Sequence, residues 1–457
     1  MPDRSIQLQT IEGAFENRES TAKILGSRLS SSNNQLAYWW RRVLLGIVII
    51  ELPLQVDKYF FHDIDLALTG ALSGFIVSMS TFCLILLYAQ WLPKLVIESR
   101  PLRGNFALAI YTAIVAASTI WALRPSLALY ETFLLGQSFL LFIYIINTVS
   151  KKNDVIFIIT CLTLCLAGEG VMMLLTQGLH RTISLGPIYF DYNEVTNRVS
   201  GSLGAANVAA SFFNLLIPLC CCVLFSTASK RLRQLSAIAL LFGGLGLVLT
   251  LSRGGWIGTT FSVGICIAMA LYKGWLSRAL FLKLILGFGL LIVACFPLLA
   301  ERILGDDNGS AQSRISLMQI SALIMSDHPF GVGANNWAVA GQHYADRTNF
   351  REEWFYTVHN KYLLVLTEVG IVGLLAFGTF ILTTIRSGWR IIGRSDRLLT
   401  PIAWGLTAGI CGQQIHMMGE IFNSRSQVQM LLLAAALIFA IDNITAPKLS
   451  SIKTESP

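Results

Sequence analysis

A histidine and an asparagine that directly precede a long apolar run are the residues in this sequence best suited to chemistry. The stretch reads "YTVHNKYLLVLTEVGIVGLLAFG", with His359 and Asn360 at its mouth and Glu368, Gly370 and Gly373 within it. An imidazole titrates near neutral pH and can take a proton from a hydroxyl group. We therefore predict a proton acceptor at the end of an apolar segment. The alternative is a histidine that only caps a helix.

Three arginines stand in short polar motifs elsewhere in the chain. Arg198 lies in "NRVSGSLGAANVAASFF", which also contains Asn207; Arg253 lies in "TLSRGGWIG"; Arg314 lies in "SAQSRISLMQISALIM". A guanidinium group stays charged and presents a planar fork of donors to oxyanions.

Apolar helices are the elements that must position these residues. The chain has 457 residues, of which 54% are hydrophobic and 13% charged, whereas a soluble domain carries about 25% charged residues. Its mean hydropathy is +0.62, and many apolar runs approach the roughly 20 residues that span a bilayer. We expect an all-α polytopic membrane protein with about twelve transmembrane helices.

The distribution of basic residues predicts the orientation. Apolar segments begin near residues 43, 66, 106, 127, 155, 205, 235, 255, 281, 360, 400 and 427. Alternate links are rich in lysine and arginine, and the positive-inside rule places them and both termini in the cytoplasm. We predict a cytoplasmic tail over 1–36, a transmembrane domain over 37–445 with an outward loop near 300–358, and a cytoplasmic tail over 446–457. The net charge of +8 is then an orientation signal that needs no nucleic acid.

Four outward stretches differ from plain connectors: those around Arg198, Arg253 and Arg314, and the His359–Asn360 pair. Basic residues on the outer side run against the positive-inside bias, so we expect something other than orientation to hold them there. The alternatives are a snorkelling interface residue for Arg253 and solvated loop charges for the other two arginines.

The outward loop contains a predicted surface helix. Its stretch "SRISLMQISALIM" places Ile315, Met318, Ala322 and Met325 at helical spacing. We expect an amphipathic helix on the outer membrane surface. Arg314 would occupy its first turn, where backbone N–H groups also point at a bound anion.

Several other polar residues leave alternatives open. Glu169 and Glu368 lie within apolar segments, where charge is costly, so each is protonated, paired or facing a polar cavity. Asp306 and Asp307 in "GDDNGS" fit a solvated turn better than a metal site. All nine cysteines fall in apolar runs, which argues against a disulfide framework or a zinc site.

Together these motifs resemble those of bacterial O-antigen ligases and their superfamily, which includes polysaccharide polymerases and O-oligosaccharyltransferases. The resemblance covers roughly residues 195–385. "HN", nine residues and "GIVG" resemble the His-Asn…Gly-x-x-Gly signature, and "LSRGG" resembles the Ser-Arg-Gly element. "RVSG…N…A" and "HPFGVGANNW" resemble two further stretches. The motifs separate the superfamily from other membrane proteins, but they separate ligase from polymerase poorly.

The resemblance implies a multispanning fold like that of other lipid-linked (GT-C-like) glycosyltransferases, in the bacterial inner membrane, with the active site facing the periplasm. It implies a glycan donor carried on undecaprenyl diphosphate and a lipid or saccharide acceptor, which for the ligases is the lipid A–core saccharide. It implies no cofactor: neither ATP nor metal takes part.

The resemblance also assigns roles to the residues. Arg198, Arg253 and Arg314 would hold the diphosphate, and His359 would be the general base, assisted by Asn360. Asn207 and Glu368 would support the site.

A small-anion transporter, similar to bicarbonate transporters that resemble this superfamily, is the alternative of a different class. A transporter should carry ionisable groups along a path near mid-membrane. The unexplained charges gather on the outer side instead, which favours the enzyme.

Overall fold

The computed structural model describes residues 37–63, 70–98, 102–305, 310–348, 350 and 356–447. The predicted tail over 1–36, nearly all of the tail over 446–457, and the Asp306–Asp307 pair lie outside these residues. Helices make up most of the described chain, as the sequence predicts.

The helices are residues 37–51, α3 (Met79–Glu98), α4 (Phe106–Ala117), η1 (Ser118–Ile120), α5 (Pro125–Thr148), α6 (Lys152–Leu179), α7 (Ala206–Phe225), α8 (Lys230–Leu249), α9 (Arg253–Tyr272), α10 (Arg278–Leu304), α11 (Ser310–Asp327), α12 (Trp337–Gln342), η2 (Ala345–Arg347), α13 (Lys361–Ile391), α14 (Leu399–His416), η3 (Met417–Gly419) and α15 (Arg425–Thr445). The strands are β1 (Lys58–Phe60), β2 (Phe75–Val77), β3 (Ile183–Leu185), β4 (Ile188–Asn193) and β5 (Arg198–Gly201).

Eight helices within the described residues are long and apolar enough to cross a membrane: α5 to α10, α13 and α15. This composition is that of a multi-pass membrane protein. Helices also occur at three of the other four predicted positions, near residues 43, 106 and 400, but they are shorter or less apolar, so the expected twelve spans stay a prediction.

The second predicted segment begins in the wrong place. It was expected near residue 66, but α3 starts at Met79. Before it, β1 and β2 pair as an antiparallel hairpin in which Lys58 lies opposite Val77. A short apolar run suits a buried strand as well as a helix, and its periodicity does not separate the two.

Polar residues directly before the apolar runs fix where several helices begin. The side chain of Ser252 accepts from the backbone N–H of Gly255 at the start of α9. Ser424 and Gln427 form a reciprocal capping box at the start of α15. Such caps satisfy backbone donors that have no partner inside the helix, and each is worth about 1 kcal/mol.

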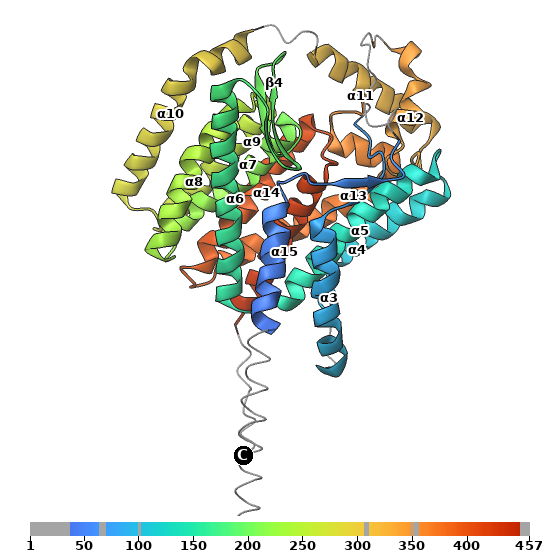
Figure 1. The fold of residues 1–457 in the computed structure, drawn as a ribbon. Coiled ribbons are helices and arrows are strands. Elements are labelled where there is room, and N and C mark those ends of the chain that lie inside the picture. Colours follow the sequence, from blue (N-terminus) through green and yellow to red (C-terminus); the bar gives the residue numbers. More distant parts are fainter. Residues whose placement is uncertain are drawn as a thin grey trace, which may run out of the picture.

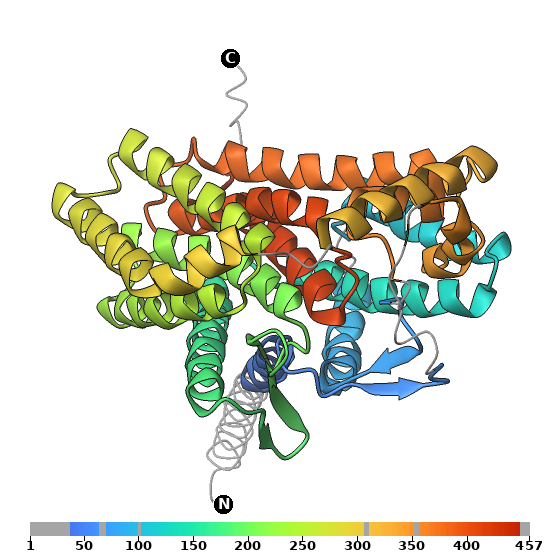
Figure 2. The same ribbon diagram turned by 90° about the horizontal axis from the view of Figure 1, so that it is seen from above.

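The core of the bundle is built around α7, which packs against α8, α9 and α14. Nearly all of α7 is buried within the protein. On the other side α5 packs against α15, and α4 against α13. Figure 1 shows β4, α11 and α12 on one side of the bundle, and Figure 2 shows α13 along one edge with α14 and α15 inside.

Links that the sequence predicts to be cytoplasmic lie together at the opposite end. The carbonyl of Arg397 accepts from the backbone N–H of Thr227, and its guanidinium donates to the carbonyl of Gly274. These bonds join the α13–α14, α7–α8 and α9–α10 links. Nearby, Asp396 pairs with Lys152 at the start of α6. The predicted division of the links into two faces is therefore present in the fold.

Helix α13 is broken at Gly370, which has φ 70° and ψ −176°. The break frees the carbonyls of Thr367 and Glu368, which accept from the backbone N–H groups of Val332 and Gly333. The "HPFGVGANNW" stretch is therefore docked onto the broken helix. A Cβ at residue 370 would lie 3.0 Å from the carbonyl oxygen of Phe330. The "GIVG" motif thus requires glycine for backbone geometry, consistent with a close-packing role.

We expect Gly370→Ala to destabilise the protein and Gly378→Ala to leave it unchanged. An alanine at a left-handed position costs about 1–2 kcal/mol, and the clash with Phe330 adds to this. Gly378 lies in the same helix, and a Cβ there would meet nothing within 4 Å. Thermal unfolding of the two detergent-purified variants measures the difference. Equal midpoints would show that the break is not required.

Candidate active site

Two different elements orient Arg198 at the start of β5. Its Nε donates to the carbonyl of Thr250 at 2.8 Å, and its Nη2 donates to Oδ1 of Asn207 at 2.8 Å. Thr250 is the C-cap of α8, where carbonyls lack helical partners and the helix dipole is negative. Among the described residues Nη1 has no partner, so this donor remains for a ligand.

Arg302 and Arg314 converge on the same place. Nε of Arg302, near the end of α10, donates to the carbonyl of Leu251 at 3.1 Å, one residue beyond the carbonyl that holds Arg198. Burial, and then the charges of Arg302 and Arg314, lower the pKa of Arg198 to about 10, while Glu420 opposes this. Three guanidinium groups from three separate segments therefore act on one another.

Glu420 is a carboxylate that lies among these arginines. It is buried, and Asn207 hydrogen-bonds its side chain. Burial raises its pKa to about 7, although Asn207, Arg314 and Arg198 act in the opposite direction. Two arginines, Arg198 and Arg314, thus act on one carboxylate whose pKa lies near neutrality. A basic site of this kind suits a polyanion.

His359 lies beside this cluster. Burial, and then the charge of Arg314, lower its pKa to about 4, with the Thr357 backbone acting in the opposite direction. The imidazole is therefore neutral at pH 7 and able to accept a proton. Its Nδ1 and the Oε2 of Glu420 are both buried without a hydrogen-bond partner among the described residues. Each such atom costs about 1–3 kcal/mol unless water or a ligand pairs with it.

Asn360 has a clear role in the fold. It is the N-cap of α13, and its Oδ1 accepts from the backbone N–H groups of Tyr362 at 3.0 Å and Leu363 at 3.2 Å. The cap fixes where α13 begins, and so where His359 stands relative to the helix. The orienting role predicted for Asn360 thus has a structural basis through the backbone.

The structure corrects one detail of the predicted surface helix α11. The helix begins at Ser310, so Arg314 is its fifth residue rather than part of the first turn. The face that packs on the protein contains Leu317, Ile320 and Ile324, whereas Ile315 and Met318 are exposed. Both faces of the helix therefore carry apolar residues, and contact of the exposed face with the membrane surface stays a prediction.

Arg253 lies at the start of α9. It is the first residue of that helix, and it is exposed, as Arg314 is. Its role in holding the diphosphate stays a prediction. Its neighbour Gly254 does reach the site, since a Cβ there would lie 3.0 Å from Cδ2 of His416.

Two buried glutamates hold the loops that carry these residues. Glu169 of α6 accepts from the backbone N–H of Ser202 at 3.0 Å and from its hydroxyl, which fixes the turn after β5. Oε1 of Glu368 accepts from the backbone N–H of Trp337 at 3.1 Å, which fixes the start of α12. Both glutamates are therefore paired, and both act on the site through backbone positions.

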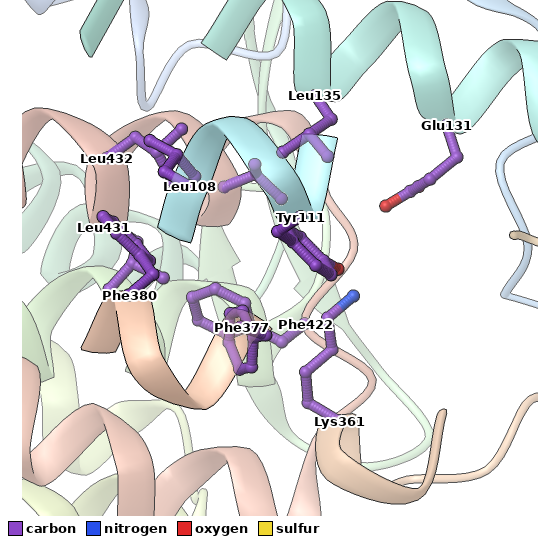
Figure 3. Close-up of a pocket in the computed structure, with 11 residues that line it drawn as sticks. Leu108, Tyr111, Glu131, Leu135, Lys361, Phe377, Phe380, Phe422, Leu431 and Leu432 are labelled. Atoms are coloured by element: carbon purple, nitrogen blue, oxygen red, sulfur yellow. The ribbon is translucent and has the colours of Figure 1, made fainter. Parts of the chain in front are cut away.

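A small cavity lies next to the start of α13, and its lining includes Leu108, Tyr111, Glu131, Lys361 and Phe377. Figure 3 shows the Lys361 amine and the Tyr111 ring directed toward one another across it. Lys361 and Glu131 are both buried and lie in electrostatic contact. This pair ties α5 to α13 beneath His359, and the sequence alone did not single it out.

The structure brings together four of the predicted residues, Arg198, Asn207, Arg314 and His359. It adds three that sequence reasoning did not assign to the site: Arg302, His416 and Glu420. The sequence feature that could have identified these three residues is their position at the outward ends of apolar helices. His416 was recognised as an outward histidine, but nothing local distinguished it from the others.

Part of the chain is similar to a known family. Residues 236–378 match the family model described as O-antigen ligase. No curated protein matches the chain. The matched range includes Arg253, Arg302, Arg314 and His359, whereas Arg198 and Glu420 lie outside it. Residues 236–378 are therefore similar to the O-antigen ligase domain, which supports the resemblance to the O-antigen ligase and polymerase-like superfamily, whose members are ligases and related glycosyltransferase-like enzymes.

Proposed function

We propose that the protein transfers a glycan from undecaprenyl diphosphate to an acceptor hydroxyl, as an O-antigen ligase does. The transfer is metal-independent and inverts the anomeric centre. His359 is the general base, and an arginine cluster, defined here as Arg198, Arg302 and Arg314, binds the diphosphate. Arg253 binds the diphosphate as well, as the sequence predicts.

The observation that carries this proposal is that Arg302 and Arg314 both act electrostatically on Arg198, and that Arg314 also acts on the neutral His359. A diphosphate is a polyanion, and it gains charge as the bond to the sugar breaks. Each hydrogen bond to such a charged group contributes roughly 1.5–3 kcal/mol. Guanidinium groups fixed by carbonyls of the α8–α9 turn stabilise that charge without reorganising, which is the basis of electrostatic catalysis.

The reaction then follows from the geometry. The acceptor oxygen attacks C1 of the sugar, and its proton passes to His359. The bond between C1 and the phosphate oxygen breaks, and its electron pair leaves with the undecaprenyl diphosphate. Attack from the face opposite the leaving group inverts the anomeric centre. Because the lipid tail of the donor lies in the bilayer, its diphosphate must sit at the membrane surface, near the helix ends where these residues lie.

We place this site on the outer face of the bacterial inner membrane. The links rich in basic residues lie at the other end of the bundle, around Lys152 and Arg397. Under the positive-inside rule that end is cytoplasmic. The arginine cluster lies at the outer end and is thus an exception to the positive-inside rule, which a bound anion explains.

A repeat-unit polymerase or an O-oligosaccharyltransferase of the same superfamily is the alternative activity, because all three use a lipid-linked donor. Deletion of the gene followed by glycolipid analysis distinguishes them. Loss of a ligase leaves core lipid without long chains, and this is the result that we expect here. Single-repeat caps on the core would identify a polymerase. An unchanged glycolipid profile would exclude both the ligase and the polymerase.

The pKa of Glu420 predicts a pH dependence of donor binding. A bound diphosphate favours the protonated, uncharged form of Glu420, so donor affinity should rise as pH falls through about 7. Glu420→Gln should bind tightly and lose most of this dependence, whereas the exposed control Glu194→Gln should keep it. Affinity for an undecaprenyl diphosphate-linked glycan, measured across this range, provides the test. An unchanged slope in Glu420→Gln would remove the carboxylate from the site.

A further inference from the structure

A chain of hydrogen bonds beneath the arginine cluster fixes the protonation of a second histidine. It begins at the capping box of α15. There the backbone N–H of Ser424 donates to Oε1 of Gln427 at 3.3 Å, and the hydroxyl of Ser424 donates to the same oxygen at 3.0 Å. Because a backbone N–H can only donate, the acceptor end of the Gln427 amide is fixed, and its Nε2 must face the other way.

Nε2 of Gln427 donates to Oγ of Ser211 at 2.9 Å. Oγ of Ser211 also lies 3.0 Å from Nδ1 of His416. Among the described residues the Ser211 hydroxyl has no other acceptor for its single proton. It therefore donates to Nδ1, and a neutral His416 ring carries its own proton on Nε2.

The Nε2 end of His416 faces the site. The ring is only 2% exposed. A Cβ at Gly254 would lie 3.0 Å from Cδ2 and 3.7 Å from Nε2, so a glycine is needed beside this edge of the ring. Three residues further on, the Cβ position of Gly419 is 3.8 Å from Nη1 of Arg314. Among the described residues, Nε2 has no hydrogen-bond partner.

The surroundings of His416 keep it a donor. Burial, and then the charge of Arg314, disfavour a positive charge on the ring. A neutral imidazole whose Nδ1 is occupied by Ser211 cannot accept a proton from the site side. It can only donate from Nε2. This is the reverse of the role proposed for His359, although both histidines lie near Arg314.

We propose that His416 is an uncharged hydrogen-bond donor to the diphosphate, held in its donor tautomer by Ser211 and Gln427. This proposal rests on the proposed function for the identity of the ligand. The neutral His416 side chain would contact the ligand directly without adding positive charge to a site that already contains several arginines. The glycine of "LSRGG" at residue 254 leaves the room that the ring needs.

Binding of inorganic pyrophosphate to the purified full-length protein tests the proposal. His416→Leu removes the donor, and affinity should fall about tenfold or more. His416→Gln places an amide N–H near the position of Nε2 and should recover most of that loss. Ser211→Ala frees the tautomer and should weaken binding by less than His416→Leu. The exposed control His343→Leu should bind as the wild type does.

Several outcomes would overturn it. One is an unchanged pyrophosphate affinity in His416→Leu. Another is an equal loss of affinity in His416→Leu and His416→Gln, which would indicate that the residue contributes packing alone. If His416→Leu fails to fold, as judged by size exclusion, unchanged binding in Ser211→Ala overturns the proposal instead. Loss of binding in arginine variants but not in His416→Leu would refute only this inference. A His416 effect on binding without any glycan transfer would refute only the proposed function, and a wild type that binds no pyrophosphate would refute both.

Discussion

Replacing His359 by alanine should slow glycan transfer about 100-fold or more, on the scale of general-base catalysis. Burial and Arg314 lower the pKa of His359 to about 4, so the proton-accepting form is present throughout the neutral range. Transfer that depends on it should fall only as pH drops toward that value. The loss in His359→Ala should appear in turnover, with donor affinity retained, because the arginine cluster remains. A purified assay with a lipid-linked donor measures both quantities.

A matched control separates chemistry from folding. His328 is a histidine at the end of α11, outside the cluster, and His328→Ala should transfer at the wild-type rate. Near-normal transfer by His359→Ala would reduce His359 to a residue beside a helix cap. The base would then have to be another outward residue.

Replacing Arg198 or Arg314 by lysine should cut transfer about tenfold or more in each case, while the protein still accumulates in the membrane. A lysine at residue 198 has its donors on a single nitrogen, so it lacks the separate Nε and Nη2 positions that reach Thr250 and Asn207. A lysine at residue 314 keeps the charge but loses the planar fork. These losses should appear mainly in donor affinity, in contrast to His359→Ala.

Arg181→Lys is the control for the arginine variants, because this exposed residue follows α6 outside the cluster. Wild-type transfer by both Arg198→Lys and Arg314→Lys would mean that the arginines are surface charges. Arg253→Lys should also reduce transfer, because the same loss of the planar fork applies there.

Much of the fold and part of the site follow from the sequence for identifiable reasons. Apolar length and basic links predict the helices and their two faces, because bilayer thickness and the positive-inside rule act on composition alone. The outward arginines stood out because they violate that rule. Arg302 did not stand out, because it ends a long apolar helix and looks like an interface residue. Glu420 did not stand out either, because it follows a short segment with no helical or strand periodicity.

Other features depend on tertiary contacts that no local pattern encodes. Gly370 reads as an ordinary small residue in an apolar run, and only the docking of Val332 and Gly333 shows why the helix must break there. The pairing of Glu169 with Ser202 and of Glu368 with Trp337 likewise joins segments far apart in the chain. Strand β2 falls within the span predicted to begin near residue 66, because short apolar runs are ambiguous.

The most direct test of the account is glycan transfer from an undecaprenyl diphosphate-linked donor to a saccharide-lipid acceptor by the purified protein. Wild type, His359→Ala and Arg314→Lys should be compared at saturating and at limiting donor. The account predicts transfer by the wild type, a turnover defect in His359→Ala and a donor-binding defect in Arg314→Lys. Equal transfer by all three proteins, or the same transfer rate in a reaction without the protein, would contradict it.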